Sequence, residues 1–249
     1  MSDFSIEANN LTKQFGELVA VDGLSFNVRK GEIYGLVGPD GAGKTTIIRM
    51  LATILRPTTG DALVAGYDLQ RDVEKIRLKI GYVAQVFNLY QDLTVSENLD
   101  FFAGIYAISD AERTERKAEL MRFSRLGSFL NRRAGYLSGG MQKKLAVSCA
   151  LMHEPEILLL DEPTIGVDPL SRQELWDILL ELNGRGVTLL VSTTYMDEAE
   201  RFGRLAFIDK GKMIAEGTPA ELKQRYTGES GLESLEAAWR TLAGQGGDA

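Results

Sequence analysis

Cysteine and histidine are almost absent from this sequence of 249 residues. Cys149 is the only cysteine, so the chain cannot form an internal disulfide, and a reducing cytoplasm is the natural compartment. We expect this thiol to be a small residue of the core. The only histidine, His153, lies in a turn between a helix and a strand, where an ordinary capping or surface role is expected.

Long apolar runs and an excess of positive charge are also missing. No stretch approaches the roughly 18 to 20 uncharged apolar residues of a membrane helix, and the polar start of the chain lacks the regions of a signal peptide. Any membrane role must therefore come from another chain. The net charge of -7 and the pI near 5.0 argue against nucleic acid as a partner, because binding to a phosphate backbone needs a basic surface.

The apolar residues, 44% of the chain, are grouped into short segments that predict strands. Near the start, segment 6–11 and the alternating Leu24, Phe26 and Val28 are bounded by glycines and predict an antiparallel β subdomain. Farther along, short and fully apolar segments are typical of a buried parallel sheet, and they are Ile33–Val37, Ile157–Leu160, Thr188–Val191 and Leu205–Ile208.

The segment at about 88–152 interrupts this pattern and is expected to be mostly helical. Thr94 with Glu97 and Ser109 with Glu112 each match a capping box. Later helices are expected to begin at Asp168-Pro169 and at Thr218-Pro219. The predicted fold class is therefore α/β, with a mainly parallel sheet, an N-terminal antiparallel β subdomain and an inserted helical subdomain.

A glycine-rich loop follows the strand Ile33–Val37 and precedes a helix, which is the context of a phosphate-binding loop (P-loop). Its backbone N–H groups can surround phosphate oxygens, and the helix N-terminus adds a positive dipole. Lys44 is expected to reach the β and γ phosphates, Thr45 to bind Mg²⁺ and Thr46 to bond the α phosphate. The predicted nucleotide-binding residues are Gly38, Pro39, Asp40, Gly41, Ala42, Gly43, Lys44, Thr45 and Thr46.

Two acidic residues, Asp161 and Glu162, follow the strand Ile157–Leu160 and are expected at the sheet edge where α/β proteins bind ligands. Asp161 is expected in the Mg²⁺ shell, and Glu162 is placed to polarise the attacking water as a general base. Alone, the pair also fits a solvated strand end. Together with the P-loop it indicates a site that hydrolyses nucleotide.

A serine-glycine segment begins another helix, whose apolar positions recur at helical spacing at Met141, Leu145, Cys149 and Met152. Ser138 is its natural N-cap, and the hydroxyl, the amides of Gly139 and Gly140 and the helix dipole together form an anion site. A plain capped helix would explain this segment if it stood alone. Its place between the P-loop and the acidic strand predicts a second phosphate-binding surface and dimerisation around nucleotide.

With these three motifs in this order, the chain resembles the ATP-binding subunits of ABC transporters over about residues 6–226. The resemblance implies a P-loop NTPase fold, ATP as nucleotide and ATP hydrolysis coupled to transport. It also implies a signature motif that contacts the γ-phosphate of ATP held by the opposite subunit, and this motif is Leu137, Ser138, Gly139, Gly140 and Met141. Met141 stands where the family generally has glutamine.

Three further residues take their expected roles from this resemblance. Gln85 fits the Q-loop, which contacts Mg²⁺ or water and joins the core to the helical subdomain. Asp168 fits the D-loop at the dimer interface, and Phe15 fits the aromatic residue that stacks on adenine. A place in the core is the alternative for a lone phenylalanine.

The chain departs from the family at the switch segment, where a histidine that contacts the γ-phosphate follows Ser192-Thr193. Thr194 stands there instead. Threonine can donate a hydrogen bond, but it has neither the positive charge nor the reach of imidazole. Because Glu162 is intact, slowed rather than abolished hydrolysis is expected at this chain's own P-loop.

The segments 92–99 and 195–200 resemble the daunorubicin-resistance-like branch, whose members mostly drive export. Separate transmembrane permease subunits are the expected partners, with their coupling helices near Gln85 and residues 88–99, and the chain at the cytoplasmic face of the inner or plasma membrane. A homodimer, a heterodimer and a tandem protein of two ATPase halves are all compatible with the sequence.

Other functions remain as alternatives. Relatives that act on chromosomes carry a long coiled coil between the P-loop and the signature, and relatives that act on ribosomes carry two such domains with basic extensions, which this sequence lacks. A nucleotide-clamped regulatory subunit is compatible with Thr194, and its turnover would distinguish it. A metabolite kinase would not need the signature.

We expect one ABC ATPase domain over residues 1–226, with the helical subdomain at about 88–152 inserted in the α/β core. Residues 227–249 are expected to form a C-terminal helix and a flexible tail, with the segment 244–249 as a frayed end. The transported molecule is selected by the membrane subunits and stays undetermined.

Overall fold

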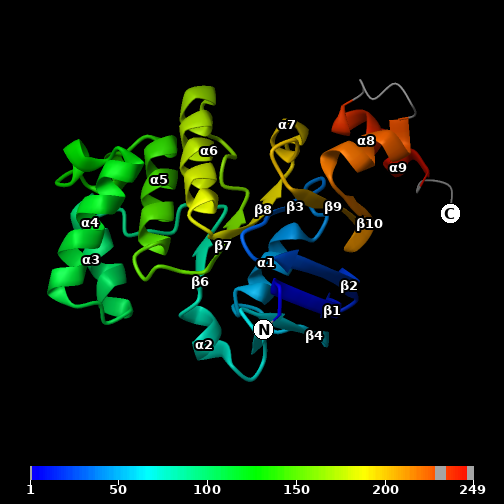
Figure 1. Ribbon diagram of the computed structural model, residues 1–249, viewed down its shortest axis with the longest axis horizontal. Helices are drawn as coiled ribbons and strands as arrows, with labels where there is room; N and C mark the ends of the chain where they lie inside the picture. Colours follow the sequence, from blue (N-terminus) through cyan, green and yellow to red (C-terminus); the bar gives the residue numbers. More distant parts are fainter. Residues whose placement is uncertain (1, 228–233, 246–249) are drawn as a thin grey trace.

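The computed structural model describes residues 2–227 and 234–245, and it contains two β-sheets with helices packed around them (Figure 1). The N-terminal sheet is antiparallel with the order β2-β1-β4-β5, which confirms the predicted β subdomain. Its strands are β1 (Phe4–Phe15), β2 (Leu18–Arg29), β4 (Thr59–Val64) and β5 (Tyr67–Asp68). The sequence pattern misses β4 and β5, because polar residues and a glycine interrupt their apolar positions.

The central sheet has the order β10-β9-β3-β8-β7-β6 and is parallel except for the β9–β10 pair. The predicted apolar segments become β3 (Ile33–Val37), β7 (Ile157–Asp161), β8 (Thr188–Thr193) and β9 (Arg204–Asp209). The pattern misses β6 (Ile80–Val83) and β10 (Lys212–Gly217), which lie at the two edges of the sheet. The α/β fold class with a mainly parallel sheet is confirmed.

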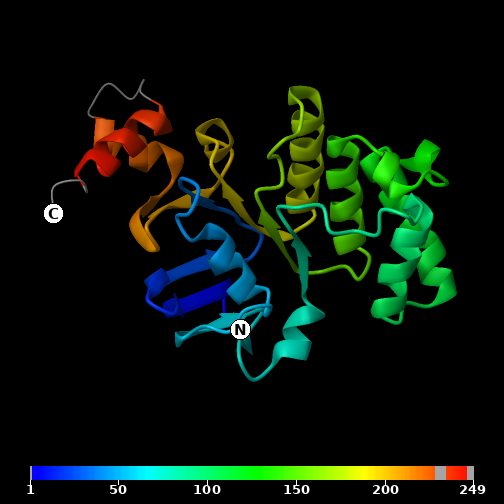
Figure 2. The same cartoon turned by 180° about the vertical axis from the view of Figure 1, so that it is seen from behind.

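Each face of the central sheet has its own apolar core. Alternate residues of β3 point to opposite faces, with Tyr34 and Leu36 in one core and Ile33 and Val37 in the other. The first core also encloses α1 (Lys44–Leu51), which lies between the two sheets (Figure 2). Because β3 is buried on both faces, it holds the P-loop that follows it in a fixed position.

The helical insert forms one end of the molecule (Figure 1). Its helices are α3 (Val95–Ile105), α4 (Asp110–Ser124) and α5 (Gly139–Ala150), and α2 (Val73–Arg77) precedes it. Both predicted capping boxes are confirmed, since the Thr94 and Ser109 hydroxyls accept from the backbone N–H three residues on and each glutamate accepts in return. The next helix, α6 (Pro169–Gly184), begins at its predicted N-cap, Asp168.

Three helices near the C-terminus lie away from this insert (Figures 1 and 2). They are α7 (Met196–Ala199), α8 (Pro219–Thr227) and α9 (Leu235–Gln245). Trp239 of α9 contacts Phe207 of β9 edge to face, with ring centroids 5.3 Å apart. Residues 246–249 of the predicted tail lie outside the described residues, and Gly244 and Gln245 belong to α9 instead. None of the helices in the described ranges is long and apolar enough to cross a membrane.

The single cysteine is buried, and the single histidine is half-buried. Cys149 is buried with a free thiol, and burial raises the pKa of this thiol. The His153 ring stacks on Tyr106 with centroids 3.7 Å apart, and its Nε2 hydrogen-bonds the carbonyl of Ile80 at 2.9 Å. The ring is half-buried, and both of its partners lie far away in the sequence, so a local pattern does not contain these contacts.

Candidate active site

The P-loop connects β3 to α1 at the carboxyl end of the central sheet. Two of its glycines leave no room for a side chain. A Cβ on Gly38 would lie 2.1 Å from the Ile208 carbonyl oxygen, and a Cβ on Gly43 would lie 2.4 Å from the Ala20 carbonyl oxygen. Gly43 also has a φ of 103°, which L side chains rarely adopt. The loop lines a cavity of about 460 Å³, together with Phe15, Leu18, Ala20, Gln85 and Glu162.

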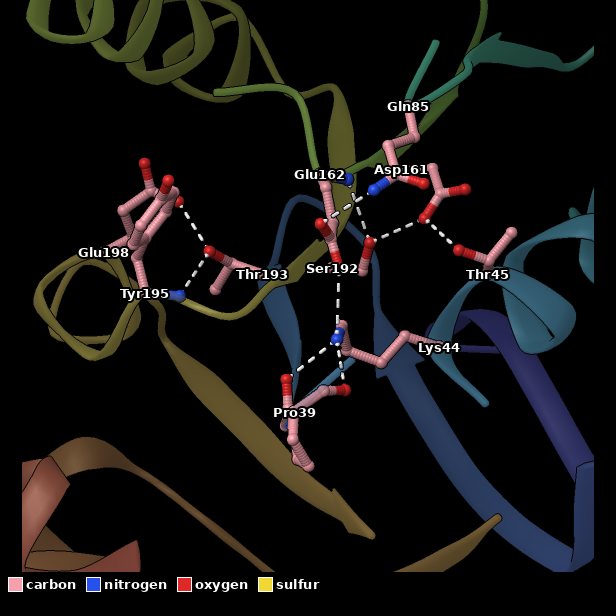
Figure 3. Close-up of polar contacts among 11 residues, drawn as sticks. Pro39, Lys44, Thr45, Gln85, Asp161, Glu162, Ser192, Thr193, Tyr195 and Glu198 are labelled. Atoms are coloured by element: carbon pink, nitrogen blue, oxygen red, sulfur yellow. Dashed lines mark hydrogen bonds and ion pairs between the residues drawn. The ribbon is translucent and has the colours of Figure 1, made fainter. Parts of the chain in front are cut away.

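The Lys44 ammonium is held by oxygen atoms of the loop and of the acidic strand end (Figure 3). It donates to the carbonyls of Gly38 and Pro39 at 2.7 and 2.9 Å and lies 3.1 Å from Glu162 Oε1. Lys44 and Glu162 are 3% and 5% exposed. A buried cation with several oxygen partners is positioned to bind further anionic oxygens, such as those of a phosphate.

Glu162 lies between two predicted site residues. Its Oε1 faces Lys44, and its Oε2 accepts from Gln85 Nε2 at 3.1 Å. Glu162 has a φ of 46°, in the left-handed region that non-glycine residues seldom adopt, and its N–H donates to Ser192 Oγ at 3.0 Å. A solvated strand end does not describe this buried carboxylate. The structure brings residues that follow β6, β7 and β3 together at one point.

Asp161 is fully buried, and only one of its two carboxylate oxygens accepts hydrogen bonds among the described residues. Its Oδ1 accepts from Thr45 Oγ1 at 3.0 Å and from Ser192 Oγ at 2.9 Å. Its Oδ2 is buried and has no hydrogen-bond partner among the described residues. Sequence reasoning missed Ser192, which contacts both acids because β8 pairs with β7 in the register that places Ser192 opposite Asp161.

This set of oxygens fits a magnesium ion. Mg²⁺ prefers one or two carboxylates completed by waters and substrate phosphates, rather than a cage made only of protein side chains. Asp161 Oδ2 and the Thr45 hydroxyl provide such a partial set beside the P-loop. In the part of the chain that the structure describes, no group of three or more His, Cys, Asp or Glu side chains could hold a metal alone.

Lys143 is a second residue of the site that sequence reasoning missed. It lies on α5, is 7% exposed, and its Nζ donates to the Gln85 carbonyl and, at 3.4 Å, to that of Ala84. Burial lowers the pKa of Lys143, whereas the charges of Asp161 and Glu162 raise it. These hydrogen bonds hold the Q-loop against α5, the helix that begins at the signature motif. A lysine in a helix normally indicates a solvated face, so no sequence signal marks it.

The signature segment begins α5 on the surface of the molecule. Ser138 is the N-cap, as predicted, and its Oγ accepts from the N–H of Met141 at 3.3 Å. Ser138 and Gly139 are exposed, whereas a Cβ on Gly140 would lie 2.4 Å from Ser171 Cβ. Gly140 therefore allows α5 and α6 to pack closely. Within one chain, residues 137–141 do not line the P-loop cavity.

Phe15, Asp168 and Thr194 lie in three different surroundings. Phe15 lines the P-loop cavity and is 47% exposed, so a place in the core is excluded. Asp168 is exposed and accepts from Ser171 N–H at 3.0 Å, and hydrogen bonding by Ser171 lowers the pKa of its carboxyl. Thr194 lines a separate hollow of about 450 Å³ with Gly38 and Pro39, so the structure places it beside the start of the P-loop.

Comparison with known sequences agrees with this geometry. The family described as "ABC transporter" matches residues 21–165. The chain is 46% identical to the probable multidrug ABC transporter ATP-binding protein YbhF of Escherichia coli, over 88% of this chain and 38% of that protein. It is 43% identical to the daunorubicin/doxorubicin resistance ATP-binding protein DrrA of Streptomyces peucetius, over 88% of this chain and 67% of that protein. The chain therefore spans well under half the length of YbhF.

Solved structures share the fold of most of this chain. An ATP-binding subunit of an ABC transporter matches with a TM-score of 0.86 and 29% identity, over 96% of this chain and 99% of that one. An ATP-binding cassette solved as a dimer in a post-hydrolysis state with ADP and Pi matches with a TM-score of 0.78 and 30% identity, over 86% and 98% of the two chains. The resemblance seen in the motifs is confirmed: this chain carries an ABC ATPase domain and belongs to the ABC transporter family of ATP-binding proteins.

Proposed function

We propose that this chain binds and hydrolyses ATP as the motor subunit of an ABC exporter. The observation that carries the proposal is the buried carboxylate of Glu162, held between Lys44 and Gln85 at the mouth of a P-loop. The names of YbhF and DrrA, which refer to multidrug transport and drug resistance, support export. The chain works at the cytoplasmic face of the inner or plasma membrane.

The residues divide the chemistry among them. Lys44 binds the β and γ phosphates, Phe15 stacks on the adenine, and Glu162 accepts a proton from the attacking water that Gln85 orients. Asp161 and Thr45 would hold Mg²⁺, which when bound neutralises charge on the phosphates. When nucleotide binds, Lys44 moves from Glu162 to the phosphate, because one ammonium cannot pair fully with both anions. The Glu162 carboxylate is then free to act as the base.

A second copy or a similar subunit completes the site. Ser138 and Gly139 are exposed and do not reach the P-loop cavity of their own chain, so their amides are available to the γ-phosphate bound by a partner. The similar cassette solved as a dimer with ADP and Pi supports this arrangement. A homodimer, a heterodimer and a tandem protein each provide the partner surface.

The permease subunits dock on the groove between the core and the helical insert. This groove has a volume of about 410 Å³, and its apolar lining includes Leu78, Leu89, Phe102, Ile105 and Tyr106. Leu78 and Ile105 are more than half exposed, which is unusual for large apolar side chains next to a cavity. An amphipathic helix of a membrane subunit fits such a groove.

Thr194 slows the reaction at this chain's own P-loop. Loss of one donor that stabilises the transition state typically costs around 3 to 4 kcal/mol, or roughly hundreds-fold in rate. Thr194 keeps a hydroxyl near the start of the loop, so part of this stabilisation remains. An asymmetric partner with a histidine at this position would host the faster site.

The test is steady-state ATP hydrolysis by the purified chain, compared with Glu162→Gln and Thr194→His, while light scattering follows the dimer. We expect Glu162→Gln to abolish turnover and to stabilise an ATP-dependent dimer, and Thr194→His to raise turnover. Hydrolysis that survives Glu162→Gln would refute the role of this carboxylate. ATP-dependent dimers without turnover in any of these chains would instead support a nucleotide-clamped regulatory subunit.

A further inference from the structure

A buried carboxylate outside the nucleotide cavity holds the switch segment in place. Glu198 of α7 is 1% exposed, and its Oε2 accepts from Thr193 Oγ1 at 2.7 Å. The same hydroxyl accepts from the N–H of Tyr195 at 3.0 Å (Figure 3). Thr194 lies between these two anchored residues. Its backbone position is therefore set by a side chain four residues further along the sequence.

The other oxygen of Glu198 faces α6, the helix that begins at the D-loop residue Asp168. Glu198 Oε1 accepts from Trp176 Nε1 at 3.1 Å, and Arg172 Nε lies 3.8 Å away. Arg172 Nε is buried without a hydrogen bond among the described residues, whereas Nη1 of the same guanidinium donates to Asp197 Oδ2 at 3.4 Å, so Arg172 pairs with both carboxylates of α7. The Arg172 guanidinium also stacks on the Tyr195 ring, 4.2 Å from its centroid.

The switch segment also contacts the P-loop through its backbone. The N–H of Gly38, the first residue of the loop, donates to the Thr193 carbonyl at 3.3 Å. Contacts therefore run without a gap from α6 through Glu198 and Thr193 to the P-loop. A buried carboxylate is strongly destabilised when its partners leave, so α6 and the switch segment are constrained to keep their relative position.

We infer that Glu198 is a positioning residue that fixes Thr194 beside the P-loop and couples it to the D-loop helix. The inference rests on the proposed role of Thr194 in ATP hydrolysis. Glu198 and Arg172 line neither the P-loop cavity nor the hollow beside Thr194, and they act through Thr193 and Tyr195. A movement of the D-loop on dimerisation is then transmitted to the phosphate end of the same chain's site.

The first test is a double-mutant cycle of Glu198→Gln and Thr194→Ala, read as ATP turnover of the full chain. Glutamine keeps the size of the side chain but presents an NH₂ group to one of the two donors. We expect Glu198→Gln to lower kcat about tenfold with KM changed less than about twofold, and to lower kcat less than about twofold when Thr194 is already alanine. Equal losses in both backgrounds would overturn the inference.

Glu200→Gln is the matched control, since Glu200 is an exposed carboxylate two residues on, paired with Lys223 at 2.8 Å. We expect its turnover to equal that of the parent. A loss in Glu200→Gln as large as in Glu198→Gln would show a general effect of charge rather than positioning, and would also overturn the inference.

A second measurement does not depend on hydrolysis. The chain has two tryptophans, so Trp239→Phe leaves Trp176 as the only fluorophore of this kind. We expect Mg·ATP to change the Trp176 emission, and the isosteric Thr193→Val to remove this change while ATP affinity, measured by calorimetry, stays within about threefold. No response in the Trp239→Phe chain, or a response that survives Thr193→Val, would overturn the inference. An intact response in a chain without turnover would contradict the proposed hydrolysis alone.

Discussion

Replacing Lys143 by methionine should displace the Q-loop while it leaves the stability of the fold nearly unchanged. Methionine has a similar length but no donor, so Lys143→Met removes the hydrogen bonds to the carbonyls of Gln85 and Ala84. Gln85 then loses the contact that holds its backbone, and its Nε2 no longer stays within 3.1 Å of Glu162 Oε2. We therefore expect this variant to disturb the orientation of the attacking water.

Opposing effects on stability nearly cancel in this variant. A hydrogen bond to a charged group contributes about 1.5 to 3 kcal/mol, and a carbonyl left without a donor costs about 1 to 3 kcal/mol. Against this, burial of an ammonium costs several kcal/mol, a penalty that the lowered pKa of Lys143 reflects and that methionine avoids. We expect the free energy of unfolding to change by less than about 1.5 kcal/mol. Turnover, in contrast, should fall about tenfold, or about 1.4 kcal/mol in the barrier.

Urea unfolding and ATP turnover measure the two properties on the same preparation. Lys144→Met is the contrasting variant: Lys144 is the next residue of α5, is 6% exposed, and pairs with Glu174 of α6 rather than with the Q-loop. We expect Lys144→Met to lower the free energy of unfolding by at least about 1 kcal/mol and to leave kcat within about twofold. Unchanged kcat in Lys143→Met, or a loss of more than about 3 kcal/mol of stability there, would refute the reasoning.

Three further predictions concern the N-cap Thr94, the pKa of His153 and the stacking of Phe15 on adenine. Thr94→Ala removes a helix N-cap and should lower the free energy of unfolding in urea by about 1 kcal/mol, whereas Thr94→Ser should not; equal effects would contradict the capping role. Burial lowers the pKa of His153 below 6.5, so its contribution to stability is present above pH 6.5 and is lost as pH falls through the lowered value. The melting temperature of the parent should therefore fall more than that of His153→Phe between about pH 7.5 and about pH 5.5, and parallel curves would disprove this. Phe15→Ala should raise the Kd for ATP roughly tenfold and leave that for tripolyphosphate unchanged in calorimetry, because stacking on a base contributes about 1 to 3 kcal/mol; equal losses for both ligands would exclude stacking.

Much of the fold could be predicted because its signals are local. The fully apolar segments became β3, β7, β8 and β9, and the capping boxes at Thr94 and Ser109 begin α3 and α4. The edge strand β6 escaped prediction because it has only 4 residues and contains a glycine, and β10 because polar residues flank its short apolar segment. The stacking of His153 on Tyr106 could not be predicted, because Tyr106 follows α3 and lies far from His153 in the sequence.

The candidate site shows the same division. Lys44, Asp161 and Glu162 could be located from spacing, because a P-loop and a strand end place them at one edge of the sheet. The contact of Ser192 with Asp161 depends on the pairing of β7 with β8, which no local pattern contains. The hydrogen bond from Lys143 to the Gln85 carbonyl depends in turn on how α5 packs against the segment that follows β6.

By itself, the sequence determined the loop that can surround phosphate, the acids that follow a buried strand, the helix caps and the absence of the switch histidine. These are properties of residue type and spacing, and the backbone geometry of a few neighbouring residues is sufficient to express them. Only the tertiary structure decided that Glu198 joins α6 to the switch segment and that Lys143 holds the Q-loop. Contacts between distant residues depend on strand register and helix docking, because a side chain reaches only a few ångströms and the whole fold decides what lies within that reach.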